Sequence, residues 1–573
     1  MMIRGIAASK GIAISKIKIY KKQALSVSDK KVKNTTEEIN IFEHARNNVI
    51  SETESLMSKA LDDESNEVYE IMAAHKEILS DYSSFVNPVN EYISKEKINC
   101  AYAVFHVLSN MANLFLSLDS EYMRERAADV EDIRDSIIAN IQGISSSFTL
   151  SEPAIIVAHD MTPSDTAKLD FSLVKGMITE VGGQTCHTAI MARTMGIPAV
   201  VSASDILSHV IDEQSIIIDG TEGCVMINAT SENFDDYSER INQLDEKQKI
   251  LRSFIGKKTL TKDSRIITLS ANIGIDNDRN IIKNSDAEGI GLVRTEFLFM
   301  QRKELPTMNE QLSVYKSIID TANGKPVTFR TLDAGGDKSL PALNLKSEEN
   351  PFLGLRAVRI SLKFIDLFKQ QLKALFIAST FGKLRIMIPM ISSCEEIDEC
   401  MAIISEVRKE LDAEKKEYTP DIPIGIMIEV PAAAIMADVL AKKVDFFSIG
   451  TNDLIQYTVA VDRGNADIAH LYTPFHPSVL NLIKNTIDRA HLNNIPCSMC
   501  GEAAGDTLMI PLLIGLGLRS FSVSPSEILS IRSLISNLSY AKCKTLAEDV
   551  LTCSSATEIK SRVTKFMEDK NEE

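Results

Sequence analysis

One histidine, His187, stands in a context that suits nucleophilic chemistry. It follows the pair Gly182-Gly183, which permits a tight turn, and it begins a stretch of helical character that runs to Arg193. A neutral imidazole is a good nucleophile near pH 7 and can carry a phosphoryl group. Backbone N–H groups at a helix start would hold the negative charge of that group. The same pattern also fits a histidine that only packs at a helix cap, so the motif alone leaves both interpretations open.

A second set of candidate residues follows short apolar runs in the C-terminal half of the chain. These residues are Arg294, Arg330, Glu429, Asn452, Asp453 and the triplet Cys500-Gly501-Glu502. Glu429 and Asp453 offer hard oxygen ligands, which suit Mg²⁺ or Mn²⁺ better than zinc. The two arginines, together with the later Arg463, would clamp a small anion that carries both a phosphate and a carboxylate.

The apolar runs before these residues predict the strands that position them. Eight such runs alternate with helical stretches between about Thr259 and Ser524, a pattern typical of a (β/α)8 barrel. Barrel enzymes carry their chemistry at the C-terminal ends of the strands, where these polar residues are expected. The predicted strands are Ile266–Leu269, Gly291–Arg294, Val327–Arg330, Arg385–Ile388, Ile424–Glu429, Phe446–Gly450, Cys497–Cys500 and Ser520–Val523.

The N-terminal half predicts a different organisation. Residues 1–22 contain short β-rich runs, and residues 27–143 have a helical pattern with Pro88 as their only proline. Residues 146–229 alternate β-rich and helical runs, which indicates an α/β domain that the first 22 residues could extend. Residues 230–258 are charged and helical and suit a linker helix.

Composition narrows the class of protein further. The length of 573 residues predicts three or four domains, and 44% hydrophobic residues with a net charge of −17 indicate an acidic globular protein. Bulk binding to nucleic acid or anionic membranes is therefore not expected. No apolar run spans a membrane, and the N-terminus lacks a secretory pattern, so we expect a cytoplasmic location. The nine cysteines form no disulfide framework, and Cys497 with Cys500 lacks the second pair of a zinc site.

Nine ordered stretches of the chain resemble enzyme I of the phosphoenolpyruvate-dependent sugar phosphotransferase system, over essentially its whole length. They are Gly5–Ala13, Glu125–Val130, Gly182–Arg193, Gly291–Met300, Arg330–Lys338, Asn350–Arg356, Met427–Ala433, Ile449–Tyr457 and Ser498–Glu502. Nine motifs in order are far more specific than a single short motif.

The resemblance implies a multidomain α/β architecture. Residues 1–22 and 146–229 would form a swivelling phosphohistidine α/β domain. Residues 23–145 would form an inserted helical bundle that binds the carrier protein, and residues 230–258 a linker helix. Residues 259–573 would form a TIM barrel that binds phosphoenolpyruvate and forms a homodimer.

The resemblance also implies a reaction. His187 would accept the phosphoryl group of phosphoenolpyruvate and pass it to a histidine of the phosphocarrier protein HPr, releasing pyruvate. The other implied roles are phosphate binding by Arg294 and Arg330, substrate orientation by Asn452 and Arg463, Mg²⁺ binding by Glu429 and Asp453 (with Mn²⁺ as the alternative ion), protonation of the enolate by Cys500, orientation of the histidine ring by Thr166, and support by Arg356. Phosphoryl transfer depends mainly on positioning and charge neutralisation, which arginines and a metal supply.

The carrier protein would dock on the helical insert, and His187 would swing to the barrel about a hinge near residues 230–260. The insert carries acidic residues at helix-like spacing, with Met72 and Ile78 nearby: Asp62, Asp63, Glu64, Glu67, Glu70, Glu77 and Asp81. A solvated helix face would explain each of these residues equally well. The chain departs from the family pattern at Gln184, where a basic residue is common, at Cys186, where serine is common, and at Asn228-Ala229, where Asn-Pro is expected.

Three alternatives remain beside this interpretation. A regulatory branch of the same family, serving nitrogen control, usually has an extra N-terminal sensory domain, and we expect no room for one before Ile3. A relative that uses ATP would need a further domain of roughly 200 residues, and no P-loop is present. A non-catalytic docking protein would keep the insert but would not need the arginine, carboxylate and cysteine set.

Overall fold

The computed structural model describes most of the 573 residues. The residues outside the description are 23–24, 63–65, 118–120, 145–147, 149, 185, 275–281, 283–284, 301, 303, 337, 339, 347 and 572–573. The side chains of residues 59–62, 66–67, 70, 121–125 and 570–571 are also outside it. The described chain forms two compact units, Met1–Lys247 and Gln248–Glu573.

The first unit is built on an eight-stranded mixed sheet with the order β1-β8-β7-β3-β4-β5-β6-β2. The strands are β1 (Met2–Arg4), β2 (Ile6–Ser9), β3 (Ile12–Tyr20), β4 (Ala154–Ala158), β5 (Val174–Thr179), β6 (Ala199–Val201), β7 (Ser215–Asp219) and β8 (Cys224–Met226). Strands β3 to β6 run parallel. The central strand β4 is buried at all five residues because its side chains alternate between two apolar cores, one on each face.

Two details of this sheet differ from the sequence prediction. Two of the short β-rich runs predicted within residues 1–22, Gly11–Ile14 and Ile17–Tyr20, belong to one continuous nine-residue strand, β3, which begins at Ile12. It pairs with β7 along its first half and with β4 along its second, so both halves belong to the ladder. Strand β8 was not predicted, since three residues are too few to show a period of two.

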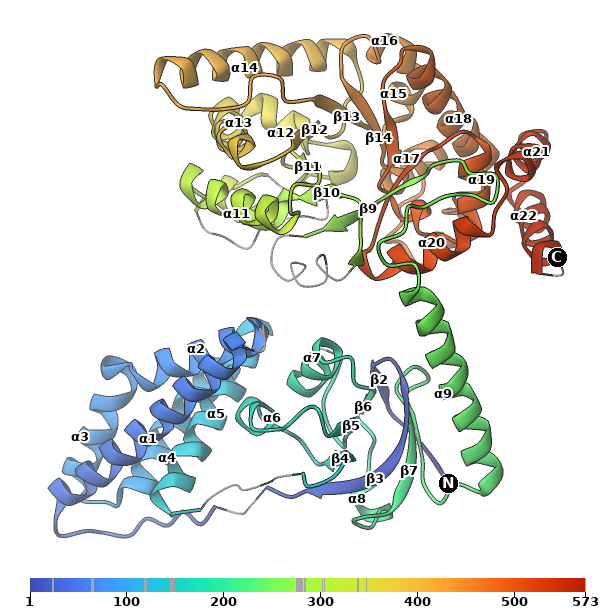
Figure 1. The fold of residues 1–573 in the computed structure, drawn as a ribbon. Coiled ribbons are helices and arrows are strands. Elements are labelled where there is room, and N and C mark those ends of the chain that lie inside the picture. The colour runs from blue at the N-terminus through green and yellow to red at the C-terminus, as the bar shows by residue number, and fades with distance from the viewer. Residues whose placement is uncertain are drawn as a thin grey trace. The chain divides into compact units, whose positions relative to one another are not determined.

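Helices α6 (Pro163–Ala167), α7 (His187–Thr194) and α8 (Ile206–His209) accompany this sheet, as Figure 1 shows. The helical insert follows β3 and consists of α1 (Thr35–Asp62), α2 (Asn66–Leu79), the π-helical turn η1 (Tyr82–Val86), α3 (Asn87–Glu96), α4 (Cys100–Leu116) and α5 (Glu121–Ile141). Pro88 lies in the first turn of α3, where its missing N–H costs no hydrogen bond. The insert has its own apolar core and also contacts the α/β domain, where Val68 and Met72 of α2 pack against Met191 of α7.

The predicted linker forms helix α9 (Ser231–Arg252), which ends earlier than the predicted residue 258. Near its start Tyr237 is buried, and Arg240 pairs with the buried Asp219 of β7 at 3.0 Å. The boundary between the two compact units falls inside this helix.

The second unit is a closed barrel of eight parallel strands, which confirms the predicted (β/α)8 fold. The strands, in barrel order, are β9 (Thr268–Ile273), β10 (Ile290–Arg294), β11 (Val327–Arg330), β12 (Leu384–Ile388), β13 (Ile424–Ile428), β14 (Phe446–Ile449), β15 (Cys497–Met499) and β16 (Ser520–Val523). Seven of the predicted strands match within two residues at each end. The first was placed at Ile266–Leu269 and lies at Thr268–Ile273, because Ile266 instead forms an isolated bridge with Leu260.

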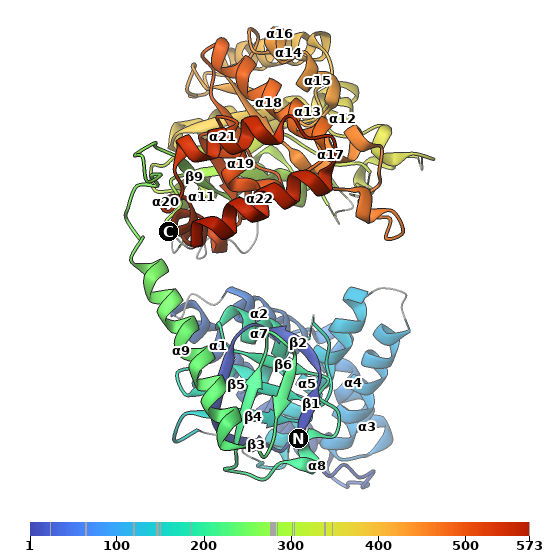
Figure 2. The ribbon, with the colours of Figure 1, turned by 90° about the vertical axis from the view of Figure 1, so that its right-hand side faces the viewer.

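The helices around the barrel are α11 (Met308–Thr321), α12 (Val358–Lys363), α13 (Ile365–Ala378), α14 (Cys394–Ala413), α15 (Pro431–Ile435), α16 (Ala437–Leu440), α17 (Thr451–Val459), α18 (Pro477–Leu492), α19 (Met509–Gly515), α20 (Ile528–Ser536), α21 (Tyr540–Val550) and α22 (Ala556–Asn571). Short 3₁₀ turns are η2 (Thr295–Leu298), η3 (Pro341–Leu343), η4 (Pro351–Leu353), η5 (Ser379–Phe381), η6 (Ala469–Leu471), η7 (Glu502–Ala504) and η8 (Pro525–Glu527). Figure 2 shows α19, α21 and α22 packed side by side. Among the described helices, none combines the length and apolar character needed to cross a bilayer.

Candidate functional site

His187 is the first residue of α7, as predicted, and Cys186 is the N-cap residue. Gly182 adopts a positive φ of 111°, and a Cβ at that position would lie 2.9 Å from the sulfur of Cys186. The glycine is therefore required both by the backbone and by the close approach of the cysteine. The turn is held by the backbone bond from Cys186 N to the carbonyl of Gly183 at 3.2 Å. Thr185 lies outside the described residues.

The imidazole of His187 is partly buried beside the helical insert. Its Nε2 atom is buried and has no hydrogen-bond partner in the part of the chain that the structure describes. Thr166 lies on α6, but its hydroxyl donates to the carbonyl oxygens of Pro163 at 2.9 Å and Thr162 at 3.1 Å. No hydrogen bond joins Thr166 to His187 among the described residues. The role predicted for Thr166 therefore stays a prediction.

Burial lowers the pKa of His187 because the charged imidazolium is poorly solvated there. The carboxylates of Asp129, Asp132 and Asp160 act in the opposite direction, while the nearby His75 lowers the pKa further. A lowered pKa keeps the imidazole neutral near pH 7, and only the neutral ring is a nucleophile.

The barrel brings the second set of predicted residues to one end, since all eight strands run parallel. Arg294 and Arg330 end β10 and β11, Glu429 follows β13, Asp453 lies in the first turn of α17 after β14, and Cys500 follows β15. A cavity of about 530 Å³ at this end is lined by Asn272, Arg294, Cys500 and Glu502, among others. This is the placement that barrel enzymes use for catalysis.

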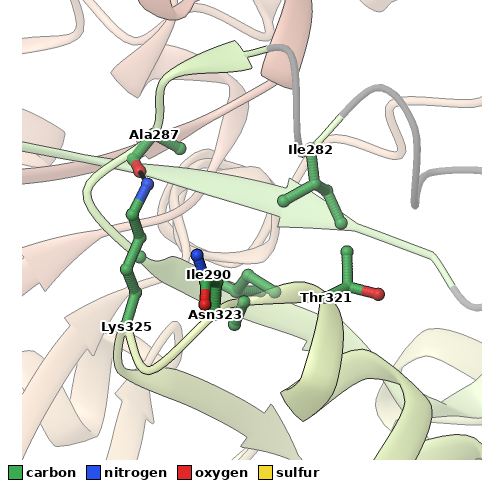
Figure 3. A pocket seen from close by; sticks show the side chains of 8 residues that line it. Ile282, Ala287, Ile290, Thr321, Asn323 and Lys325 are labelled. Atoms are coloured by element: carbon green, nitrogen blue, oxygen red, sulfur yellow. Dashed lines mark hydrogen bonds between the residues drawn. The ribbon is translucent and has the colours of Figure 1, made fainter. Parts of the chain in front are cut away.

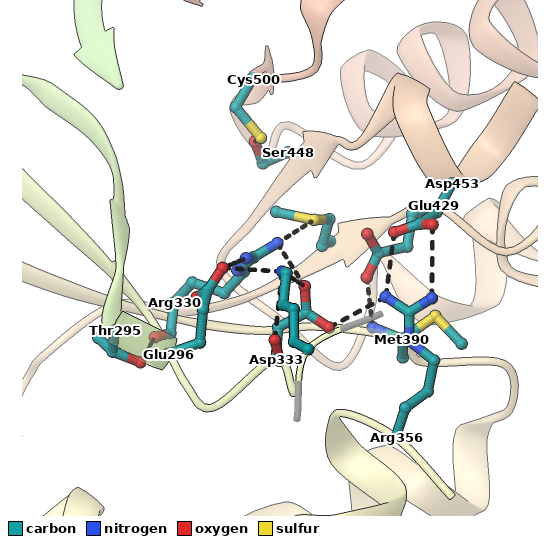
Figure 4. A network of polar contacts seen from close by, with 12 residues as sticks. Thr295, Glu296, Arg330, Asp333, Arg356, Met390, Glu429, Ser448, Asp453 and Cys500 are labelled. Carbon is teal, nitrogen blue, oxygen red and sulfur yellow. Dashed lines mark hydrogen bonds and ion pairs between the residues drawn. The ribbon is translucent and has the colours of Figure 1, made fainter. Parts of the chain in front are cut away.

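Arg330 is buried and lies between two carboxylates, as Figure 4 shows. Its guanidinium is 2.6 Å from Glu296 Oε1 and 3.0 Å from Asp333 Oδ2. Lys338 joins the same two carboxylates at 2.8 Å and 3.0 Å. The Arg330, Lys338 and Arg356 cations hold the pKa of Asp333 well below its usual range. These carboxylates keep the cations in place, and Glu296 Oε2 and Arg330 Nε are buried without a partner among the described residues.

Arg356 connects this network to the predicted metal ligands. Its guanidinium lies 3.2 Å from Asp333 Oδ1, 3.2 Å from Asp453 Oδ2 and 2.9 Å from the hydroxyl of Tyr457. The next residue, Ala357, has a φ of 50°, which is unfavourable for a residue with a Cβ. Strained backbone of this kind clusters at active sites and ligand-binding segments.

Glu429 and Asp453 are both buried and fit a divalent cation. Burial is the largest cause that raises the pKa of Glu429 to about 8, and the nearby carboxylates of Asp453 and Asp333 add to it. One Glu429 oxygen accepts from the backbone N–H of Met390 at 2.6 Å. A divalent ion would relieve this repulsion between like charges. No group of three metal-ligating side chains occurs among the described residues, so the predicted Mg²⁺ site stays a prediction.

Cys500 is buried in the cavity wall, and burial raises the pKa of its thiol. The hydroxyl of Ser448, on β14, donates to its sulfur at 3.2 Å and lowers that pKa in part. A thiol that is protonated at neutral pH can act as a general acid. Cys497, the first residue of β15, is also buried.

Asn452 is placed at the same end of the barrel. Its amide donates to Glu502 Oε1 at 2.8 Å and accepts from the backbone N–H of Glu502 at 2.9 Å. Tyr472 donates to the carbonyl of Asn452 at 3.1 Å and is also close to Arg463. Asn452 and Arg463 therefore share Tyr472 as a neighbour, and their role in orienting the substrate stays a prediction.

The acidic residues predicted on the insert can be assessed only in part. Asp63 and Glu64 lie outside the described residues, and so do the side chains of Asp62, Glu67 and Glu70. Glu77 is exposed on α2. Asp81 caps the turn η1 by accepting from Ser83 and Ser84, and these bonds lower the pKa of its carboxyl to about 2.

A further cavity of about 290 Å³ lies at the opposite ends of strands β10 and β11 (Figure 3). It is lined by Ile282, Ile290, Thr321 and Asn323, and Lys325 donates across its edge to the carbonyl of Ala287 at 2.7 Å. Contacts at the N-terminal ends of barrel strands serve stability, and none of the predicted site residues lines this cavity.

Sequence reasoning missed several residues that surround the site. Glu296, Asp333 and Lys338 lie inside motifs that were recognised, but their pairing with Arg330 was not predicted. Ser448 and Asn272 contact Cys500 from other strands. A signal was present for Glu296 and Asp333, which follow the ends of β10 and β11 by two and three residues.

Comparison with known families agrees with this arrangement. The family model described as "PEP-utilising enzyme, N-terminal" matches residues 4–126. The "PEP-utilising enzyme, mobile domain" matches residues 150–223, and the "PEP-utilising enzyme, PEP-binding domain" matches residues 248–540. Fold and site therefore define a phosphoenolpyruvate-utilising enzyme with a mobile α/β domain and a substrate-binding barrel.

Relatives of similar length narrow this class. The phosphoenolpyruvate-protein phosphotransferase of Priestia megaterium is 42% identical over 559 residues, which is 97% of each chain. The protein of the same name from Bacillus subtilis (strain 168) is 41% identical over 97% of this chain and 98% of its own. A solution structure of Enzyme I (nEIt) is 36% identical, covers 42% of this chain and 99% of its own, and has a TM-score of 0.39. The chain belongs to the phosphoenolpyruvate-protein phosphotransferase family.

Proposed function

We propose that the chain takes a phosphoryl group from phosphoenolpyruvate onto His187 and passes it to a histidine of the carrier protein HPr, releasing pyruvate. This is the first step of the sugar phosphotransferase system. The observation that carries the proposal is that one chain contains two sites with complementary chemistry. A histidine of lowered pKa begins a helix in the first unit, and arginines, carboxylates and a cysteine share one end of a barrel in the second.

In the barrel, Arg294 and Arg330 bind the phosphate of the substrate, and Asn452 with Arg463 orients it. Glu296 and Asp333 keep Arg330 aimed at the site, so little reorganisation is needed when the substrate arrives. Because two arginines face the phosphate, negative charge that shifts to the leaving oxygen is neutralised as the phosphorus–oxygen bond breaks.

Glu429 and Asp453 would hold Mg²⁺, with Mn²⁺ as the alternative ion, and Arg356 pairs with the Asp453 carboxylate at 3.2 Å. The ion would supply positive charge that stabilises the charge developing on the substrate. Loss of the phosphoryl group leaves an enolate, and Cys500 donates its proton to the methylene carbon to form pyruvate. The hydroxyl of Ser448 donates to the sulfur at 3.2 Å and helps to orient it.

The phosphoryl group moves from the barrel to the carrier protein on His187. Since the two sites lie in different units, transfer requires the first unit to move, and we propose that the hinge lies within residues 230–260. The neutral imidazole attacks phosphorus, and the N–H groups at the start of α7 stabilise the phosphorylated ring. HPr docks on the helical insert, where the exposed Glu77 offers one acidic contact for a basic partner.

Two properties of the assembly complete the proposal. The barrel forms a homodimer, which exposed apolar side chains at Ile435 and Val439 on α15 and α16 support. The protein works in the cytoplasm, a reducing compartment, which agrees with nine cysteines that are all unpaired.

Intact mass after incubation with phosphoenolpyruvate and Mg²⁺ tests the reaction. We expect one acid-labile phosphoryl group on the wild-type protein and none on His187→Ala. His159→Ala is the matched control, because His159 belongs to the same α/β domain but is exposed and pairs with Glu180 at 2.8 Å. An unchanged mass of folded wild-type protein would reject the enzyme and favour the docking protein.

A further inference from the structure

Asn272, at the end of β9, reaches across the barrel wall to the backbone of Cys500. Its Nδ2 atom donates to the carbonyl of Cys500 at 3.0 Å and to the carbonyl of Ser522 at 2.9 Å. Strand β16, which carries Ser522, lies between β9 and β15, so one side chain connects three neighbouring strands. Asn272 also lines the cavity that contains Arg294 and Cys500.

The amide of Asn272 has only one orientation available. Both Nδ2 hydrogens are used, and Oδ1 accepts from the hydroxyl of Ser522 at 2.6 Å. Rotating the amide by 180° would place its oxygen against two carbonyl oxygens, which is unfavourable. Gly291, on β10, provides the room for this arrangement, because a Cβ there would lie 2.3 Å from the hydroxyl oxygen of Ser522.

Cys500 needs this contact because it lies just beyond the ladder of β15, which ends at Met499. Its N–H donates to the carbonyl of Ile449 at 3.1 Å, on the side of β14. Its carbonyl is held by Asn272 from the side of β9. Two bonds from opposite sides thus set the direction in which the cysteine side chain leaves the backbone.

We infer that Asn272 is a positioning residue for Cys500, because it holds the cysteine's backbone so that the thiol keeps its place in the cavity wall. The inference rests on the proposed role of Cys500 in proton transfer. In the reverse direction the Cys500 thiolate, the form left after the thiol has given up its proton, takes a proton from the methyl carbon of pyruvate: the C–H bond breaks, the S–H bond forms, and the electron pair of the C–H bond remains on the enolate. A loosened backbone slows this step, since proton transfer depends steeply on geometry.

Exchange of the pyruvate methyl hydrogens in D₂O with Mg²⁺, followed by proton NMR, measures this step without phosphoryl transfer. We expect Asn272→Ala to lower the maximal exchange rate by about tenfold or more, with the KM for pyruvate unchanged within about twofold. His187 should still be phosphorylated by phosphoenolpyruvate at a rate within about threefold of wild type, because the arginines are untouched. Asn485→Ala is the matched control, since Asn485 also donates to a barrel carbonyl, that of Ala434 at 2.7 Å.

Ser522→Ala provides a second variant that only frees the Asn272 amide oxygen. We expect it to slow exchange by about two- to fivefold, and the double variant to be no slower than Asn272→Ala, since both act through one contact. Exchange at the wild-type rate in Ser522→Ala and Asn272→Ala would overturn the inference, and so would a raised KM, which would make Asn272 a substrate ligand. Cys500→Ala tests the proposed role of Cys500 separately from the inference about Asn272. If exchange continues at the wild-type rate in this variant, Cys500 is not the group that transfers the proton.

Discussion

Replacing Gly501 by alanine should slow pyruvate formation by about 100-fold, although it adds a single methyl group. Gly501 has φ −74° and ψ 169°, angles that alanine adopts without strain, so the effect must come from contacts. An added Cβ would lie 2.4 Å from the backbone nitrogen of Thr451 and 2.0 Å from its hydroxyl oxygen. Thr451 begins α17, which carries Asn452 and Asp453.

The size of the effect follows from these distances. Ordinary contact begins at 3.4 Å, so the methyl group and the Thr451 nitrogen must separate by about 1.0 Å (3.4 minus 2.4). Misplacing a catalytic group by about 1 Å slows the reaction by about 100-fold. This corresponds to an increase of about 2.7 kcal/mol in the activation free energy. Cys500 precedes the substitution and Asp453 lies on the helix that is displaced, so both are affected. Overpacking should also lower the free energy of unfolding by about 1–3 kcal/mol.

Steady-state pyruvate formation with saturating HPr, phosphoenolpyruvate and Mg²⁺ measures this loss. Gly505→Ala is the matched control, because the only tight contact of its added Cβ is with the end of the flexible Glu527 side chain, at 2.8 Å, and the nearest backbone atom is at 3.6 Å. Adding Thr451→Ala to Gly501→Ala removes the nearest oxygen and should recover part of the rate. If folded Gly501→Ala works within about threefold of wild type, the geometric reasoning is wrong.

Further predictions concern charge and anchoring. Because the pKa of Glu429 is raised to about 8, protons compete with Mg²⁺ for its carboxylate. The Mg²⁺ affinity measured by calorimetry should therefore fall about tenfold between pH 7 and pH 6. An affinity that does not change with pH would contradict this. NMR should show His187 titrating below the ordinary 6.5. Since its folded pKa is the lower one, its contribution to stability is present above pH 6.5 and is lost as the pH falls through the folded value. The buried Arg532 donates to the hydroxyl of Thr259 at 3.0 Å and pairs with Asp286. Arg532→Met should therefore lower the free energy of unfolding of the barrel unit in urea by about 2–4 kcal/mol, while pyruvate formation is retained. An unchanged free energy of unfolding would exclude an anchoring role for Arg532.

The buried charges of the barrel are better explained by function than by stability. Arg330, Asp333 and Arg356 are removed from water, and burying charges seldom adds net stability even when they are paired. In this family the barrel must receive a substrate with several negative charges. Preformed cations held by Glu296 and Asp333 meet that substrate without reorganising, which is the arrangement that lowers a barrier most effectively.

Much of the fold could be predicted from local pattern. Strand β16 and the ends of β10 and β11 were predicted to the residue, because a short apolar run that stops at a polar residue is a local signal. The first barrel strand was misplaced, since Ile266 extends the apolar run but pairs outside the barrel. Strand β8 was missed because its pairing with β1 and β7 decides its existence.

The sequence by itself determined which side chains end the strands, and thus the class of chemistry at one end of the barrel. Only the tertiary structure decided how those side chains pair and what their pKa values become. Asn272 and Cys500 are 228 residues apart along the chain, and Arg356 and Asp453 are 97 apart. Pairing depends on distances that appear only when the barrel closes. The pKa of Glu429 depends on burial beside Asp453, which no local pattern contains, because desolvation is a property of the packed interior.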